Sequence, residues 1–187
     1  SEWRAIRGKD MAMIFQDSGS ALDPIVRIGK QFRELFKSHI EITNDECDRR
    51  AIELLESVSL PNGADILRRY PHELSGGQRQ RVGIAMALAL DPALLIGDEP
   101  TSALDVTTQS QVVMQMLELA KEHNSAIVMV THNLGVAAYI SDYIIVMKKG
   151  RVVDAGTPQD ILENPSNEYT KQLKDAVPTL EGGRYID

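Results

Sequence analysis

The sequence predicts an α/β fold with a mostly parallel sheet and an inserted helical subdomain. After residue 92, short continuous apolar runs alternate with amphipathic segments, which is the pattern of parallel strands joined by helices. Before it, residues 28–90 look helical, because apolar side chains repeat at helical spacing in three stretches. A strand-like apolar run at residues 11–16 precedes these helices. We therefore expect the helices to interrupt a single α/β core.

The first half of the chain is expected to hold one strand and at least three helices. Residues 11–16 form a buried strand that ends at Gln16, and residues 17–24 form a polar loop. The spacing Thr43–Glu46 and again Ser75–Gln78 predicts two capping boxes at helix starts. The predicted apolar faces of the three helices are Ile28, Phe32, Leu35, Phe36 and His39, then Ala51, Leu54, Leu55 and Val58, then Val82, Ala85, Met86 and Ala89.

The second half is expected to alternate strands and helices. Continuous apolar runs predict buried strands, and the run Ala93–Ile96 predicts a strand buried on both faces. A hairpin is predicted around Lys148-Lys149-Gly150, and Thr157-Pro158 predicts a helix start with proline in its first turn. The expected elements are strands Ala93–Ile96 and Ala126–Val130, helices Val106–His123 and Leu134–Ile140, hairpin strands Tyr143–Met147 and Arg151–Ala155, and a last helix Asn167–Ala176.

Composition excludes several classes of protein. The chain has 187 residues, 43% hydrophobic and 25% charged, which is ordinary globular composition. No apolar run approaches the roughly 18 residues of a membrane span, and the polar start predicts no signal peptide. The single cysteine, Cys47, excludes an internal disulfide framework and suits a reducing cytoplasm. A net charge of −7 does not favour nucleic acid as a partner.

The segment Leu74-Ser75-Gly76-Gly77-Gln78 is the strongest chemical signal. Two glycines at a helix start let an anion approach the backbone, where the N–H groups and the helix dipole both favour negative charge. Ser75 adds a hydroxyl donor. The alternative is an ordinary serine-capped helix whose glycines lie in a tight turn.

Polar residues end three of the predicted strands. Asp98 and Glu99 follow an apolar strand, and adjacent carboxylates are usually held with a cation. His132 follows the strand Ala126–Val130, and Gln16 ends the first strand. Ligands of α/β sheets bind at the carboxyl ends of strands. The alternatives are a helix cap at Asp98, a backbone-bonded strand end at His132 and a loop start at Gln16.

Taken together, these residues resemble the ATP-binding cassette (ABC) ATPase family over essentially the whole chain. Leu74–Gln78 looks like its LSGGQ signature, and Asp98 and Glu99 look like its Walker B aspartate and catalytic glutamate. Gln16 and His132 match the Q-loop and H-loop residues, and Ser102-Ala103-Leu104-Asp105 matches the D-loop. The resemblance implies a P-loop NTPase-like core with an inserted helical subdomain.

The resemblance also implies cofactors, roles and partners. ATP and Mg²⁺ would be the cofactors, with Asp98 and Gln16 near the metal, Glu99 activating water and His132 contacting the γ-phosphate. Two cassettes would dimerise head to tail, so that Ser75, Gly76, Gly77, Gln78 and Asp105 serve the shared nucleotide sites. The helical subdomain would contact membrane-spanning permease subunits at the cytoplasmic face of the membrane.

Within that family the chain is similar to ATP-binding subunits of peptide and nickel importers. The segments Met13–Asp17, Ala21–Pro24, Tyr169–Leu173 and Ala176–Pro178 carry this likeness. One alternative is a soluble ABC ATPase acting on DNA or the ribosome, but only 57 residues separate Gln16 from Leu74, too few for a long coiled coil. The other alternative is a non-catalytic interaction fragment.

The sequence contains no P-loop motif, G-x-x-x-x-G-K-[ST]. We expect an N-terminally truncated cassette that lacks the first strands and the P-loop and is inactive alone. Its open sheet edge would invite pairing with another copy. The expected divisions are residues 1–19 (partial core with the Q-loop), 20–91 (helical subdomain with the signature), 92–166 (core with Walker B, D-loop and H-loop) and 167–187 (terminal helix and tail).

Overall fold

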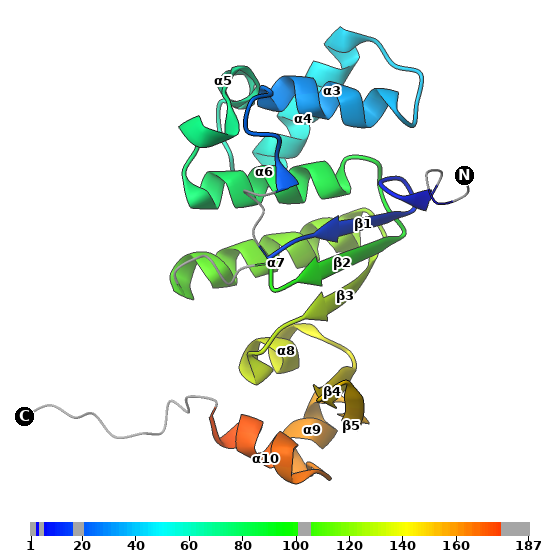
Figure 1. The fold of residues 1–187 in the computed structure, drawn as a ribbon, viewed down its shortest axis with the longest axis vertical. Helices are drawn as coiled ribbons and strands as arrows, with labels where there is room; N and C mark the ends of the chain where they lie inside the picture. Colours follow the sequence, from blue (N-terminus) through cyan, green and yellow to red (C-terminus); the bar gives the residue numbers. More distant parts are fainter. Residues whose placement is uncertain (1–2, 4–5, 17–20, 101–105, 177–187) are drawn as a thin grey trace, which may run out of the picture. The chain divides into compact units, whose positions relative to one another are not determined.

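The computed structural model describes residues 3, 6–16, 21–100 and 106–176. Contacts divide the chain into two compact units, residues 1–130 and residues 131–187, which are described separately below. The predicted α/β class is confirmed, with a parallel sheet and helices (Figure 1). The finer four-part division stays a prediction.

A three-stranded parallel sheet organises the first unit. Its strands are β1 (Met11–Ile14), β2 (Leu94–Asp98) and β3 (Ala126–Val130), in the spatial order β1-β2-β3. Met13 pairs with Ile96, which pairs with Val128 on the other side. The carboxyl ends of all three strands therefore lie at the same edge of the sheet, as the sequence predicted for Gln16, Asp98 and Glu99.

Helices cover one face of this sheet. Helix α6 (Gly76–Leu88) contacts β1, and α7 (Val106–Glu122) contacts β3 and α6 (Figure 1). Leu95 is fully buried in the core beneath them. On the opposite face Met13 is 41% exposed and Val128 52% exposed. The prediction that Ala126–Val130 is a buried strand was therefore wrong, because both helices lie on the same side of the sheet. Strand β2, which was predicted to be buried on both faces, has half-buried side chains at Leu94 and Ile96 on that open face.

The helical part of the first unit packs around buried aromatic and aliphatic side chains. It consists of α3 (Ile28–Lys37), α4 (Asn44–Ser57), α5 (Gly63–Arg68) and a 3₁₀ turn at Pro71–Glu73. Phe32, Phe36 and Leu55 are fully buried and belong to the same core cluster as the sheet. Helix α5, which begins at Gly63, was not predicted.

Cys47 lies on the inner face of α4 with no exposed surface. Burial raises the pKa of its thiol, because a thiolate would lose its hydration there. This side chain therefore acts as a small hydrophobic residue of the core.

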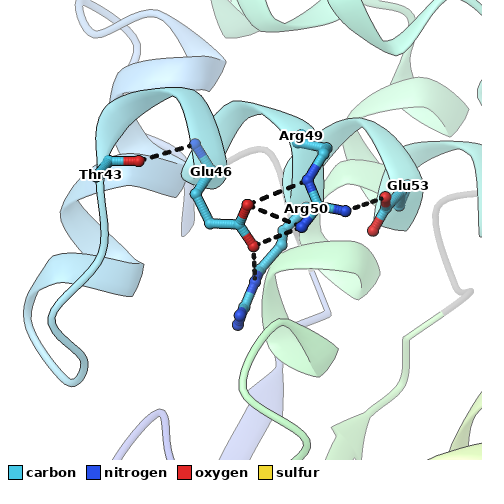
Figure 2. A network of polar contacts seen from close by, with 5 residues as sticks. All are labelled: Thr43, Glu46, Arg49, Arg50 and Glu53. Carbon is cyan, nitrogen blue, oxygen red and sulfur yellow. Dashed lines mark hydrogen bonds and ion pairs between the residues drawn. The ribbon is translucent and has the colours of Figure 1, made fainter.

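The start of α4 shows half of the predicted capping box. The Thr43 hydroxyl accepts a hydrogen bond from the Glu46 amide at 3.3 Å. The Glu46 carboxylate instead pairs with Arg49 at 2.7 Å and Arg50 at 3.0 Å, and Arg49 also reaches Glu53 (Figure 2). These arginines lower the pKa of Glu46, since they stabilise its charged form. The nearby positive charges explain why this carboxylate does not return to Thr43.

The second unit is a small cluster around a hairpin. It contains α8 (Leu134–Ile140), β4 (Ile144–Lys148), β5 (Arg151–Gly156), α9 (Pro158–Glu163) and α10 (Glu168–Asp175). The antiparallel hairpin and the proline in the first turn of α9 confirm the predictions. Its buried hydrophobic core consists of Leu134, Ile144, Val146 and Ile161.

No helix in the described part of the chain is both long and apolar enough to cross a membrane.

Gly29 tests the close packing of α3 on α5. A Cβ at this position would lie 2.9 Å from the backbone oxygen of Leu67, so Gly29→Ala must push the helices apart. We expect it to lower the free energy of unfolding by about 1–3 kcal/mol, the usual cost of overpacking. The neighbouring exposed Lys30→Ala is the control and should change it by less than about 0.5 kcal/mol. Equal unfolding midpoints in denaturant for the two variants would contradict this account.

Candidate functional site

The carboxyl edge of the sheet brings two of the predicted residues into contact. Gln16 lies just beyond β1 and Glu99 just beyond β2, and their side chains meet across the sheet. The Gln16 amide nitrogen Nε2 donates to Glu99 Oε2 at 3.2 Å. The parallel register explains the meeting, because Ile14 pairs with Gly97 and the two chains leave the sheet side by side. Gln16 is exposed and Glu99 is half-buried, so this pair is open to a ligand.

Glu99 occupies a sharp corner that several contacts hold in place. Its φ is +43°, in the left-handed region that costs a residue with a side chain about 1–2 kcal/mol. Its amide donates to the Val130 carbonyl at 2.9 Å. Pro100 packs over Gly97, where an added Cβ would come within 3.2 Å of the proline ring. We call residues 97–100 the Glu99 corner.

Asp98 is the last residue of β2 and pairs with Val130 of β3. It is half-buried next to Glu99, so two carboxylates end the strand together. In the part of the chain that the structure describes, no group of three or more His, Cys, Asp or Glu side chains gathers around a metal position. Two carboxylates instead fit Mg²⁺ that arrives with phosphate oxygens and water as its other ligands.

The N-terminus of α6 has the predicted open geometry. Ser75 Oγ accepts from the Gln78 amide at 3.2 Å, and Gln78 Oε1 accepts from the Ser75 amide at 3.0 Å, so the predicted capping box is confirmed. A Cβ added at Gly76 would meet no atom within 4 Å. The amides of Gly76 and Gly77 belong to the first turn and have no acceptor within the helix. This end of the helix therefore fits an anion.

Two further predicted residues, His132 and Asp105, lie elsewhere in the chain. His132 is exposed and belongs to the second unit, one residue before Asn133, which caps α8 by accepting from the Val136 amide at 3.1 Å. Asp105, with the rest of the predicted D-loop, lies outside the described residues. Their roles stay predictions.

Sequence reasoning missed Gln80, a buried glutamine on α6. Only 3% of Gln80 is exposed, and its Nε2 donates to the carbonyl oxygen of Pro100. It lies four residues before Ile84, on the buried face of α6. A polar side chain on an apolar helical face is the signal that points to such a residue, since buried polar groups are bonded.

A cationic cavity of about 380 Å³ lies between α3, α4 and α5. Arg33 bonds Asp48 through Nε at 2.7 Å and through a second guanidinium nitrogen, and Asp48 raises the pKa of Arg33. Lys30 and Arg68 also line the cavity, as does Arg27, whose guanidinium lies 5.4 Å from the centre of the Tyr70 ring. Positive side chains exceed negative ones here, so the cavity fits an acidic group.

Comparison with known proteins identifies the family. The family model described as ABC transporter matches residues 1–102. The chain is 46% identical over 180 residues to the oligopeptide transport ATP-binding protein OppD of Bacillus subtilis, covering 96% of the chain and 50% of that protein. It is 43% identical over 187 residues to the glutathione import ATP-binding protein GsiA of Escherichia coli, covering all of the chain and 30% of that protein. The chain thus spans half or less of these relatives.

Solved structures agree on the fold. The ATP-binding cassette MJ0796, in a dimeric post-hydrolysis state bound to ADP and Pi, superposes with a TM-score of 0.72 at 31% identity, over 84% of this chain and 66% of that one. CbiO1 from Clostridium perfringens, part of the ABC transporter complex cbiONQ, gives 0.69 at 29% identity, over 81% of this chain and 59% of that one. The predicted cassette fold is confirmed.

Gly76→Ala tests whether the space in front of the N-terminus of α6 is empty in the folded protein. Because the new methyl group meets no atom and alanine favours a helix over glycine, we expect the free energy of unfolding to stay equal or to rise by up to about 1 kcal/mol. Thermal unfolding measures this, with the crowded Gly29→Ala as comparison. A fall of more than about 1 kcal/mol would show that the space before Gly76 is filled by the protein itself.

Proposed function

The chain belongs to the ABC transporter family, and from this premise we propose that it is part of the ATP-hydrolysing subunit of an importer that takes up peptides. The observation that carries the proposal is the contact between Gln16 and Glu99 at the carboxyl edge of the sheet, 3.2 Å between amide and carboxylate. It supports a polar site at the place where α/β folds bind ligands, built from residues that match the family's nucleotide-handling motifs.

Glu99 is proposed as the general base of hydrolysis. Its carboxylate accepts the proton of the attacking water, and the Gln16 amide orients that carboxylate through the bond already in place. Asp98, on the same strand end, is a ligand for Mg²⁺, with Gln16 nearby. When bound, MgATP would supply the phosphoryl group, and its Mg²⁺ would neutralise part of the phosphate charge. His132 is proposed to contact the γ-phosphate.

The N-terminus of α6 is proposed to bind the nucleotide of a partner cassette. Ser75 offers its hydroxyl, Gly76 and Gly77 offer amides to phosphate oxygens, and Gln78 holds the cap closed through its bonds to Ser75. Asp105 belongs to the same proposed interface. The similarity to MJ0796, whose structure is dimeric, favours a pair of cassettes, which we propose to be head to tail. A homo-oligomer through the sheet edge is a further arrangement that the sequence predicts.

Peptides are the proposed substrate class because relatives named for oligopeptide transport, dipeptide transport and glutathione import share 43–46% identity with this chain. Nickel, the other solute predicted from the sequence resemblance, is the alternative. The importer would place this chain at the cytoplasmic face of the membrane beside its permease.

A soluble ABC ATPase with a coiled-coil insertion has less support. The described residues between Gln16 and Leu74 contain no helix longer than the 14 residues of α4.

A non-catalytic interaction fragment is the other alternative. The 187 residues contain no P-loop motif, and we propose that they do not hydrolyse ATP by themselves. The experiments below therefore use the complete protein with any segments that flank these residues.

Glu99→Gln tests the proposed base. Because the amide cannot accept the proton of water, we expect kcat for ATP hydrolysis to fall by about 100- to 10,000-fold in the complete protein, while ATP binding is retained. Steady-state phosphate release and nucleotide titration measure the two quantities. Glu73→Gln, on the exposed 3₁₀ turn, is the matched control and should leave kcat unchanged.

Hydrolysis by Glu99→Gln at more than a tenth of the wild-type rate would remove Glu99 from this role. An absence of Mg²⁺-dependent ATP hydrolysis in the complete wild-type protein would remove the proposed function itself.

The cationic cavity between α3, α4 and α5 is proposed as the docking surface for an acidic cytoplasmic segment of the permease. Charge complementarity supports this partner, since Arg27, Lys30, Arg33 and Arg68 line the cavity. Among these four, Arg33 pairs with Asp48 of the lining and Lys30 with Glu34 beside it. Arg68 is exposed at the end of α5, where its side chain can turn toward a ligand.

Arg68→Glu tests this surface. Because juxtaposed like charges cost several kcal/mol, we expect the affinity for the permease to fall at least about tenfold, with ATP binding unchanged. Co-purification with the permease at graded salt concentrations measures the loss. Arg151→Glu, an exposed charge reversal in the second unit, is the control and should bind normally. Equal binding by both variants would place the permease elsewhere.

A further inference from the structure

We propose that Gln80 is a positioning residue for Glu99, joining the anion-binding end of α6 to the catalytic corner of the same chain. The proposal rests on the function proposed above and adds a residue to which none of the family motifs assigns a role. Its basis is the hydrogen bond from Gln80 Nε2 to the Pro100 carbonyl oxygen, between residues 20 positions apart in the sequence.

This bond has the features of an anchor. Gln80 is only 3% exposed, so its amide group cannot exchange the bond freely for water. Removing the donor leaves a buried carbonyl without this partner, which costs more than the bond itself contributes. Pro100 has no amide hydrogen, so its carbonyl is the backbone group through which a neighbour can hold it.

The anchored residue directly follows Glu99. Several contacts hold the backbone of the Glu99 corner: among them, the Glu99 amide bonds Val130, the Pro100 ring packs on Gly97, and the Pro100 carbonyl accepts from Gln80. The left-handed φ of +43° at Glu99 persists only where surrounding contacts impose it. Of the contacts named here, the bond from Gln80 comes from helix α6, whereas the other two come from the sheet and from the corner itself.

Helix α6 carries both ends of the proposed coupling. Ser75 caps its N-terminus, and Gln80 lies five residues further along, about 7.5 Å of helix rise. A rigid helix that shifts when an anion binds at Ser75–Gln78 must carry the Gln80 amide with it. When the N-terminus of α6 closes on the nucleotide of the partner cassette, it would therefore shift the position of Glu99 in this chain's own site. Hydrolysis at one site would then depend on whether the other site holds a nucleotide.

The test replaces Gln80 by methionine in the complete protein assembled with its partners. Methionine keeps the length and volume of the side chain and removes the donor. We expect kcat for ATP hydrolysis to fall by about 10- to 100-fold, since a displacement of about 1 Å can cost that much, with KM within about twofold of wild type. A purely structural defect would instead change KM and stability together with kcat.

Gln115→Met is the matched control. Gln115 on α7 accepts from Arg81 of α6 and donates to Ser59, so it makes the same kind of contact to the same helix but away from the Glu99 corner. The same substitution there should leave kcat within about twofold. Gln80→Leu is the second variant: it also lacks a donor, is smaller than methionine, and should reproduce the loss if the methionine variant fails to fold.

Amide hydrogen exchange gives a readout independent of catalysis. The Glu99 amide should exchange faster in Gln80→Met than in wild type or Gln115→Met, because the corner has lost the contact from Gln80. Unchanged kcat and unchanged exchange, or an equal kcat loss in Gln115→Met, would overturn the proposal. If the wild type hydrolyses no ATP, the proposed function fails, and exchange at Glu99 alone decides whether Gln80 positions it.

Discussion

The parallel pairing of β2 with both of its neighbours is the constraint on which the rest of the site depends. It places the ends of three strands at one edge and fixes which residues leave the sheet together. Ile14 lies opposite Gly97, and Asp98 lies opposite Val130. The side chains of Gln16 and Glu99 therefore come into contact directly at the ends of their strands. A slip of one residue would turn the strand's side chains to the other face.

That constraint also explains what the sequence could predict. Polar residues directly after apolar strands mark a ligand-binding edge, and this rule located Gln16, Asp98 and Glu99. The Ser75–Gln78 spacing predicted a reciprocal cap, which the structure contains. The strand Ala126–Val130 and the helix Leu134–Ile140 have the predicted bounds, because each is a continuous apolar segment between clear turn residues. Local signals were sufficient in these places.

Other features depend on partners distant in the sequence. An apolar run predicts a strand but not how many of its faces are covered, so the exposure of Val128 was missed. Helix α5 has six residues, too few for a repeating apolar pattern. Gln80 is an uncharged side chain whose partner is a backbone carbonyl 20 residues away, and nothing in the residue types marks that pair. The fold alone brings them together.

The buried thiol of Cys47 has a practical consequence for studying motion in this protein. It is the single cysteine of the sequence, has no exposed surface, and has a raised pKa, so it reacts poorly with thiol reagents. These 187 residues therefore behave as a cysteine-free background for labelling. A pair of cysteines introduced at surface positions of α6 and near the end of β2 would carry spectroscopic probes selectively, and the distance between them would report helix movement during turnover.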